Sequence, residues 1–308
     1  MTLEPDLRCS AWARAERVDP IGTAGSYAGF LLVEWPLPWP RDVADIPALA
    51  PLTAATRRVK IRLQAVVPQR GRDLNVSIWR GAAEQGRFLG QEAPAGHDPA
   101  ATASALLVGE RVAGLRPIDA AEVLVCGHGR RDRCCGSLGT SLEVELRSAA
   151  DLETSGVRLR RTSHTGGHRF APTAILFPEG TVWGYLDAES LTGIVTRRTP
   201  IADVAQLYRG CCGLPSPAVQ ALEREVLGVV GWPLYDRVRR GSDLAGGPVS
   251  LDVEGPDGRS RRWTGRVVTK RVLPVPKCGE AVTGEEKTEL ELAVEDFEEV
   301  FRPAERAG

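Results

Sequence analysis

The chain has 308 residues, of which 43% are hydrophobic and 26% are charged, and its formal net charge is -1. This length allows one large domain or, as we expect, two or three smaller ones with cores of their own. The near-zero charge excludes a global field that would recruit nucleic acid or an anionic membrane. The longest apolar runs, such as 30–33 and 123–125, are too short to span a bilayer, and the opening residues lack a basic segment followed by an apolar one. We therefore expect a cytoplasmic protein without nucleic-acid or membrane partners.

Residues 1–112 predict a strand-rich region of mixed α/β structure. Short apolar segments bounded by Gly or Pro indicate strands at 28–35, 60–67, 74–79 and 87–91. The stretch 92–103 is small, polar and Pro-containing, and it predicts a boundary loop. We find no catalytic pattern in this region.

Residues 113–210 show a clearer order of elements. A buried strand at 121–125 leads into the loop CGHGRRDRCCGSLG, and apolar spacing predicts a helix at 140–149 and then a strand at 157–161. Pro-Glu-Gly predicts a turn between strands at 173–177 and 182–186. A helix at 187–197, with Asp187 as its N-cap, completes the unit.

Residues 211–308 predict a small appended α/β module. Ser216 and Pro217 begin a helix whose apolar stripe extends to Trp232 and is expected to face a core. Strands are expected on both sides of the turn at 255–258, and 289–294 alternates like an exposed strand.

Cysteine and histidine spacing indicates a metal site in the middle region. Seven cysteines, an odd number, argue against a disulfide framework in a cytoplasmic chain. Cys126 and Cys135 lie nine positions apart after a buried strand, and His164 and His168 follow Cys135 by 29 and 33 positions. Two thiolates with two imidazoles suit either a tetrahedral Zn²⁺ or an iron–sulfur cluster, and ligand type alone leaves both open.

The composition of the two loops favours the cluster. Both are rich in glycine, which lets backbone N–H groups approach bridging sulfides; the glycines are Gly127, Gly129, Gly136, Gly166 and Gly167. Arg130, Arg131 and Arg133 would add positive potential beside an anionic cluster, or they are merely solvated.

The motif C-x-H-G-x-R-D-x-x-C-G followed by H-x-x-x-H resembles the sucrase/ferredoxin-like family, and LLVEWPLPWPRD at 31–42 resembles the amino-terminal half of that family. The resemblance covers roughly residues 9 to 212. It implies a thioredoxin-like fold with a [2Fe-2S] cluster held by Cys126, Cys135, His164 and His168.

Several further residues are expected around these ligands. His128 fits the motif and is expected to order the loop, and Asp132 is expected to order the loop or orient an arginine such as Arg131. Gly136 follows the second ligand cysteine. The resemblance also implies a cis peptide bond at Ala171–Pro172, which places Pro172 beside the metal loop.

Cys134 departs from the family pattern, which usually has Arg at this position. Cys134 is therefore an alternative ligand or a reduced bystander, and the spacing favours Cys135. Cys211 and Cys212 are expected to be buried, with a vicinal disulfide or a reactive thiol as the alternative. Cys9 and Cys278 show no local pattern and receive no role.

The resemblance implies a one-electron carrier with a pH-coupled potential and an unidentified redox partner, either a reductase or an electron acceptor. One alternative is a structural Zn²⁺ protein. Another is thiol–disulfide chemistry through Cys134 and Cys135, which ranks last because adjacent cysteines close only a strained ring. A sucrase activity has no support, since no pair of carboxylates is singled out.

Overall fold

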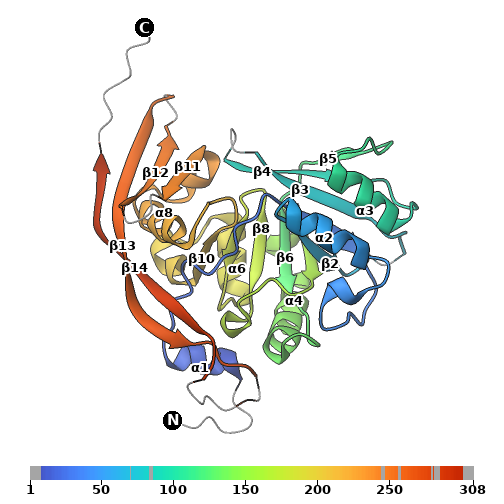
Figure 1. Ribbon diagram of the computed structural model, residues 1–308, viewed down its shortest axis with the longest axis horizontal. Helices are drawn as coiled ribbons and strands as arrows, with labels where there is room; N and C mark the ends of the chain where they lie inside the picture. The colour runs from blue at the N-terminus through green and yellow to red at the C-terminus, as the bar shows by residue number, and fades with distance from the viewer. Residues whose placement is uncertain are drawn as a thin grey trace.

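The computed structural model describes residues 8–69, 71–82, 86–243, 247–255, 258–278, 280 and 285–300. It contains a ten-stranded mixed sheet and a separate four-stranded antiparallel sheet (Figure 1). The order of the large sheet is β10-β9-β8-β6-β7-β2-β1-β3-β4-β5, and that of the small sheet is β11-β12-β13-β14. The predicted mixed α/β class is confirmed.

The large sheet includes every strand expected between residues 28 and 186. Its strands are β1 (Gly29–Glu34), β2 (Ile61–Val66), β3 (Val76–Ala82), β4 (Arg87–Glu92), β5 (Arg116–Ile118), β6 (Glu122–Cys126), β7 (Arg158–Thr162), β8 (Ala174–Phe177), β9 (Thr181–Trp183) and β10 (Tyr208–Cys211). The small sheet consists of β11 (Arg239–Asp243), β12 (Val249–Glu254), β13 (Ser260–Pro274) and β14 (Thr288–Val300). The strands predicted around 255–258 and at 289–294 are therefore also confirmed.

The helices are α1 (Cys9–Ala15), α2 (Ala50–Arg58), α3 (Pro99–Val108), α4 (Thr140–Arg147), α5 (Ala150–Thr154), α6 (Ala188–Thr196), α7 (Ile201–Val204) and α8 (Pro217–Val230). The helices predicted at 140–149, at 187–197 and after Ser216 are confirmed as α4, α6 and α8. The Asp187 side chain accepts a hydrogen bond from the Ser190 N–H at 2.8 Å, which confirms the predicted N-cap. The predicted cis Ala171–Pro172 bond is also present.

The predicted loop at 92–103 was wrong in its second half, because α3 begins at Pro99. The Asp98 carboxylate accepts hydrogen bonds from the N–H groups of Ala100 and Ala101 at 2.8 and 2.9 Å. Asp followed by Pro is a helix start signal, and alanine has the highest helix propensity. The small residues that resemble a linker in the sequence are therefore the first turns of a helix.

The large sheet is continuous across the predicted boundary near residue 112. β1 and β2 pair in parallel, and β6 and β7 pair in parallel. The two parallel pairs meet where Val66 pairs with Thr162. The carboxyl ends of β6 and β7 therefore lie at the same edge of the sheet. Two loops emerge from this edge, the cysteine loop (126–139) and the histidine loop (163–173).

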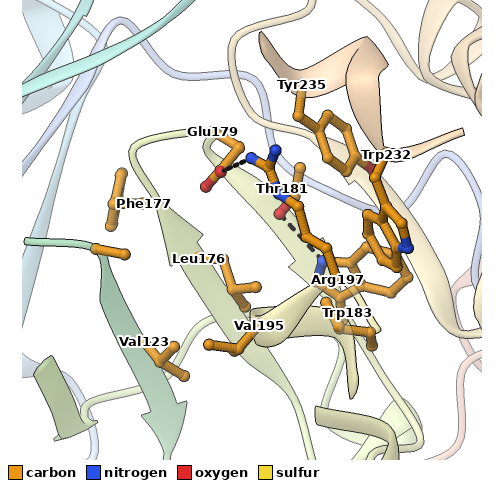
Figure 2. Close-up of a pocket in the computed structure, with 12 residues that line it drawn as sticks. Val123, Leu176, Phe177, Glu179, Thr181, Trp183, Val195, Arg197, Trp232 and Tyr235 are labelled. Carbon is orange, nitrogen blue, oxygen red and sulfur yellow. Dashed lines mark hydrogen bonds and ion pairs between the residues drawn. The ribbon is translucent and has the colours of Figure 1, made fainter. Parts of the chain in front are cut away.

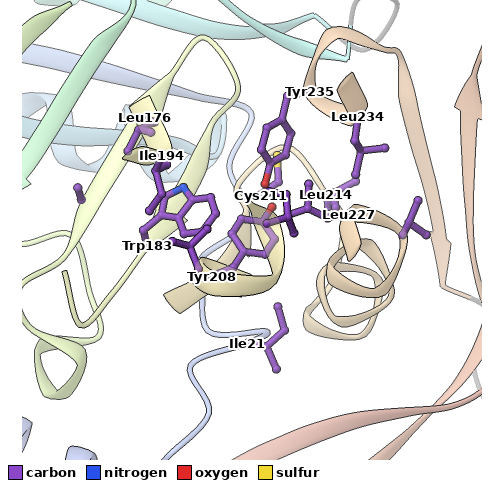
Figure 3. Packing of buried hydrophobic residues seen from close by; sticks show 14 of the residues in the cluster. Ile21, Leu176, Trp183, Ile194, Tyr208, Cys211, Leu214, Leu227, Leu234 and Tyr235 are labelled. Atoms are coloured by element: carbon purple, nitrogen blue, oxygen red, sulfur yellow. The ribbon is translucent and has the colours of Figure 1, made fainter. Parts of the chain in front are cut away.

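The carboxy-terminal helix α8 lies between the large and small sheets and fills a shared core. Val219, Leu222 and Val226 of its predicted stripe are fully buried. Figure 3 shows Leu227 of this helix in the same apolar cluster as Trp183 and Tyr208 of the large sheet. The predicted core-facing orientation of the stripe is confirmed.

The long β13–β14 ribbon extends to the amino-terminal helix α1 (Figure 1). Arg271 on β13 donates to the Glu16 carbonyl at 3.2 Å, and the Asp19 N–H donates to a Glu291 carboxylate oxygen on β14 at 3.0 Å. The segment that follows α1 is thus held against the end of the ribbon where β13 finishes and β14 begins. Within the described residues, no helix has both the length and the apolar character required to cross a membrane.

Beneath the edge from which the cysteine and histidine loops emerge, a buried ion-pair network joins three strands of the large sheet. Arg160 on β7 donates to Glu34 of β1 at 2.5 Å and to Glu122 of β6 at 3.3 Å. The side chains of Arg160 and Glu34 are 4% exposed and that of Glu122 is fully buried. Breaking such a network by removing one partner is costly because the other charges stay buried.

We therefore expect Arg160→Leu to lower the free energy of unfolding by about 3–5 kcal/mol. Arg158→Leu is the matched control, because Arg158 lies on the same strand and pairs with Glu92 where both side chains are about a quarter exposed. This variant should lose no more than about 1 kcal/mol. Urea unfolding of both variants provides the comparison, and equal losses would show that the buried network is no more important than the outer pair.

Candidate metal centre

The cysteine loop and the histidine loop are positioned by the pairing of β6 with β7. Cys126 is the last residue of β6 and pairs with Thr162, the last residue of β7. The Gly127 N–H donates to the Thr162 carbonyl at 3.0 Å, which keeps the loops together beyond the strands. Cys135 begins a wide helical turn, Cys135–Gly139, that leads into α4.

Three of the four predicted ligands meet in what we call the inner site, formed by Cys126, Cys135 and His164. The ligand atoms of these three residues all lie within 4.8 Å of one another, in a geometry that could hold a metal ion. Both cysteines are fully buried, whereas the His164 side chain is 21% exposed. The site thus excludes most solvent while keeping one imidazole near the surface.

The two cysteines of the inner site differ in acidity. The hydrogen bond with Cys135 is the largest effect and lowers the pKa of Cys126, and His164 lowers it further, whereas burial opposes both. The same hydrogen bond and burial raise the pKa of Cys135. Cys126 is therefore the thiol that loses its proton first, and metal binding would require Cys135 to lose its own proton.

His168 lies beside the inner site. Its ring centroid is 6.4 Å from that of His164, and its Nδ1 atom lies 3.0 Å from the Cys9 sulfur. The carboxylate of Asp132 lies between the two imidazoles, with its oxygens 3.3 Å from His164 Nδ1 and 3.5 Å from His168 Nδ1. The structure therefore places the Asp132 carboxylate against the histidines, and burial raises its pKa.

A second group of thiols, which we call the three-thiol site, consists of Cys9, Cys134 and Cys278. The sulfur of Cys9 lies 3.5 Å from that of Cys134 and 3.2 Å from that of Cys278, and the last two sulfurs are 3.0 Å apart. The Ser10 hydroxyl donates to the Cys134 sulfur at 3.2 Å. Hydrogen bonds among the thiols raise the pKa values of Cys9 and Cys134 and lower that of Cys278.

Cys134 and Cys135, although adjacent, belong to different sites. The spacing argument placed Cys135 with Cys126, and the structure has this arrangement. The sequence did not reveal that Cys9 and Cys278 lie close together, because these residues are 269 positions apart and neither lies in a motif. Only the approach of the β13–β14 ribbon to α1 brings them together.

His128 fixes the position of the histidine loop, as expected from the motif. The His164 N–H donates to His128 Nδ1 at 3.2 Å, and the opposite ring nitrogen, Nε2, lies 2.8 Å from the Pro40 carbonyl. Because Nδ1 accepts, Nε2 carries the proton and donates, so the ring is neutral. Burial lowers the pKa of His128, which agrees with this state.

Close backbone packing explains two of the glycines in these loops. A Cβ atom on Gly136 would collide with the Cα of Gly129, and one on Gly139 would collide with the carbonyl of Cys126. Gly166 and Gly167 have φ angles of 87° and 65°, which side chains rarely adopt. The glycines therefore let the cysteine loop fold tightly and the histidine loop reverse.

Polar residues outside the sequence motif support the histidine loop, and two of them, Gln64 and Arg209, are buried. Arg62 donates to the His164 carbonyl at 2.6 Å, and Gln64 donates to the same oxygen at 3.3 Å. Arg209 donates to the Gly166 carbonyl at 3.0 Å, and burial lowers its pKa to about 10. These residues come from β2 and β10, where single polar residues in strands give no recognisable pattern.

The remaining predicted residues lie at the edges of the site. Arg131 is 3.6 Å from the Asp42 carboxylate, while Arg130 and Arg133 are exposed. Ala171, which precedes Pro172, packs in the same apolar cluster as Cys9, Cys126, Cys134 and Cys135. The cis bond therefore lies against the cysteines, as the resemblance implied.

Cys211 and Cys212 are buried and free, as expected, and belong neither to the inner site nor to the three-thiol site. The Cys211 thiol donates to the Glu179 carbonyl at 3.3 Å, and burial raises its pKa to about 11. A small pocket near them is lined by residues such as Val123, Leu176 and Trp232, with the Arg197–Glu179 ion pair at one side (Figure 2). Its lining contains neither cysteine nor histidine.

Comparison with known proteins agrees with the motif. The family described as Sucrase/ferredoxin-like matches residues 20–210, which is more than half of the chain. The chain belongs to the sucrase/ferredoxin-like family. No solved structure matches the chain at a significant level.

Curated relatives match over shorter stretches. Altered inheritance of mitochondria protein 32 of Meyerozyma guilliermondii is 37% identical over 78 residues, which is 24% of this chain and 28% of that protein. The protein of the same name from Clavispora lusitaniae is 36% identical over 99 residues, or 30% of this chain and 36% of that protein. The chain thus matches about a third of the length of these relatives.

Proposed function

We propose that this sucrase/ferredoxin-like protein is a one-electron carrier with a [2Fe-2S] cluster bound by Cys126, Cys135, His164 and His168. The observation that carries the proposal is the convergence of Cys126, Cys135 and His164 at one edge of the sheet. His168 is the fourth ligand in this proposal, because its ring lies beside that of His164 and both imidazoles contact the Asp132 carboxylate.

The inner site has the properties that such a cluster requires. Its thiols are fully buried, and the close packing of Gly136 against Gly129 keeps the cysteine loop compact around them. His164 Nδ1 is buried and makes no hydrogen bond within the described part of the chain; it faces the Asp132 carboxylate at 3.3 Å, a contact that a metal bound at this nitrogen would replace. A [2Fe-2S] cluster with two imidazole ligands supplies one-electron chemistry at a higher potential than one with four thiolates.

The residues around the site hold these ligands in place. Arg62, Gln64 and Arg209 fix the backbone of the histidine loop through its carbonyl groups, and His128 holds the His164 N–H. Asp132 orients both imidazoles. Because the supporting bonds are already formed, little rearrangement should accompany a change of charge at the site.

We also infer that the middle region has a thioredoxin-like fold. Its order is strand β6, helix α4, parallel strand β7, the antiparallel hairpin β8–β9 and helix α6. A cis proline precedes β8 beside the metal loops. The added strands β2, β1, β3, β4 and β5 extend this unit on the β7 side.

Metal analysis and spectroscopy test the cluster directly. Protein purified without air should be red-brown, contain equal amounts of iron and sulfide, and give an EPR signal after one-electron reduction. His164→Ala should lose iron or change the spectrum, whereas His97→Ala, at an exposed position, should do neither. A colourless protein with Zn²⁺ in the inner site would replace this function with a structural metal domain.

The reduction potential should fall as the pH rises, by up to about 59 mV per unit, because a histidine ligand gains a proton when the cluster is reduced. Cys126, His128 and Asp132 face His164, and Asp132, Cys9 and Cys278 face His168. Asp132→Asn is therefore a necessary control and should keep the slope. His164→Cys should lower the potential and weaken the slope. A potential that stays constant between about pH 6 and 10 would contradict histidine ligation.

The exposed Arg130 and Arg133 lead us to propose an acidic redox partner, because both lie on the cysteine loop. Small redox reagents can test the local charge. Oxidation of the reduced protein by anionic ferricyanide should be fast at low salt and slow down as salt is added, unlike oxidation by a cationic ruthenium ammine. Arg130→Glu with Arg133→Glu should slow the ferricyanide reaction about tenfold.

The matched control places the same charge change on α2, as Arg57→Glu with Arg58→Glu, two exposed positions. This control should leave the ferricyanide rate nearly unchanged. Equal effects of the two double variants would mean that net charge matters and the position of the arginines does not.

A further inference from the structure

We propose that the three-thiol site, Cys9, Cys134 and Cys278, is a second metal site that binds one thiophilic divalent ion, Zn²⁺. The ion would hold the amino-terminal helix α1 and the β13–β14 ribbon against the loop that carries the inner site. The proposal rests on geometry that is separate from that of the inner site.

The distances among the three sulfurs suit ligands around an ion. They range from 3.0 to 3.5 Å. A disulfide bond would require about 2.05 Å, and three thiols cannot all be paired. Two thiolates at about 2.3 Å from a tetrahedral Zn²⁺ lie roughly 3.8 Å apart, so a small outward movement of each side chain would admit the ion.

The three thiols come from segments that other contacts already hold in place. Cys9 begins α1, Cys134 is in the cysteine loop, and Cys278 follows β13. Arg271 on β13 binds the Glu16 carbonyl, and Arg169 beside the histidine loop forms an ion pair with Glu289 on β14. The site is therefore largely formed before an ion arrives, which reduces the entropy cost of binding.

The chemistry of the site favours a soft ion. Its ligand atoms are three sulfurs, which select Zn²⁺ over Mg²⁺ or Ca²⁺. Cys9 and Cys134 are fully buried, whereas Cys278 is partly exposed and gives the ion a route from solvent.

The site belongs to parts of the chain that lie largely outside the family match. Cys9 and Cys278 both fall outside residues 20–210, and only Cys134 falls inside. Each outer segment thus supplies one ligand of the three-thiol site. The third ligand comes from the cysteine loop, which also supplies Cys126 and Cys135 to the inner site. An ion bound there would connect these added segments to the matched region.

Metal analysis of purified protein tests the proposal, with iron, sulfide and zinc measured on the same sample. Wild type should contain about one zinc per chain in addition to iron. Cys278→Ser should reduce zinc to background and leave iron unchanged, whereas Cys126→Ser should lose iron and keep zinc. Cys211→Ser is the matched control, because it replaces a buried cysteine outside both sites and should change neither metal.

His168→Ala separates this inference from the proposed function. Loss of iron with retention of zinc would support both assignments. Loss of zinc with retention of iron would mean that His168 is a ligand of the three-thiol site and not of the cluster. Its Nδ1 lies 3.0 Å from the Cys9 sulfur, and this outcome would still support a second metal site.

A second measurement avoids dependence on variants that fail to fold. Alkylation of wild type, followed by mass mapping, should modify Cys278 slowly in the purified protein and at least tenfold faster after zinc is chelated. Wild type without zinc, or zinc that is lost in Cys126→Ser and retained in Cys278→Ser, would overturn the proposal.

Discussion

The parallel pairing of β6 with β7 is the constraint on which both the inner site and the three-thiol site depend. It aligns Cys126 with Thr162, so the segments that contain the cysteines and the histidines leave the same edge of the sheet. A shift of one residue in this register would turn Cys126 towards the opposite face of the sheet. Arg160 secures the pairing from below by joining β7 to β6 and β1 through buried carboxylates.

Above this edge, the histidine loop is held mainly through its backbone. Arg62 and Gln64 share the carbonyl of His164, and Arg209 binds that of Gly166. Burying the Arg209 guanidinium for this purpose is expensive unless its donors are satisfied. The backbone of the loop is thus fixed independently of the imidazoles, whose Nδ1 atoms both face the Asp132 carboxylate.

The sequence predicted those features that depend on local pattern. Alternation and turn residues located β1 to β4 and β6 to β9, and ligand spacing selected Cys135 over Cys134 for the inner site. It misinterpreted α3 because alanines and a proline are common to linkers and helix starts. It could not connect Cys9 with Cys278, since only the tertiary path of the β13–β14 ribbon brings them within 3.2 Å.

The adjacency of Cys134 and Cys135 has a consequence for how the two sites influence each other. Both residues lie at the start of a helical turn, where successive side chains point about 100° apart and so reach different neighbours. Asp132 and His168 lie in the same small region, with His168 Nδ1 close to both Asp132 and Cys9. Occupation of the three-thiol site would fix Cys134, and through its peptide bond it would restrict the positions open to Cys135.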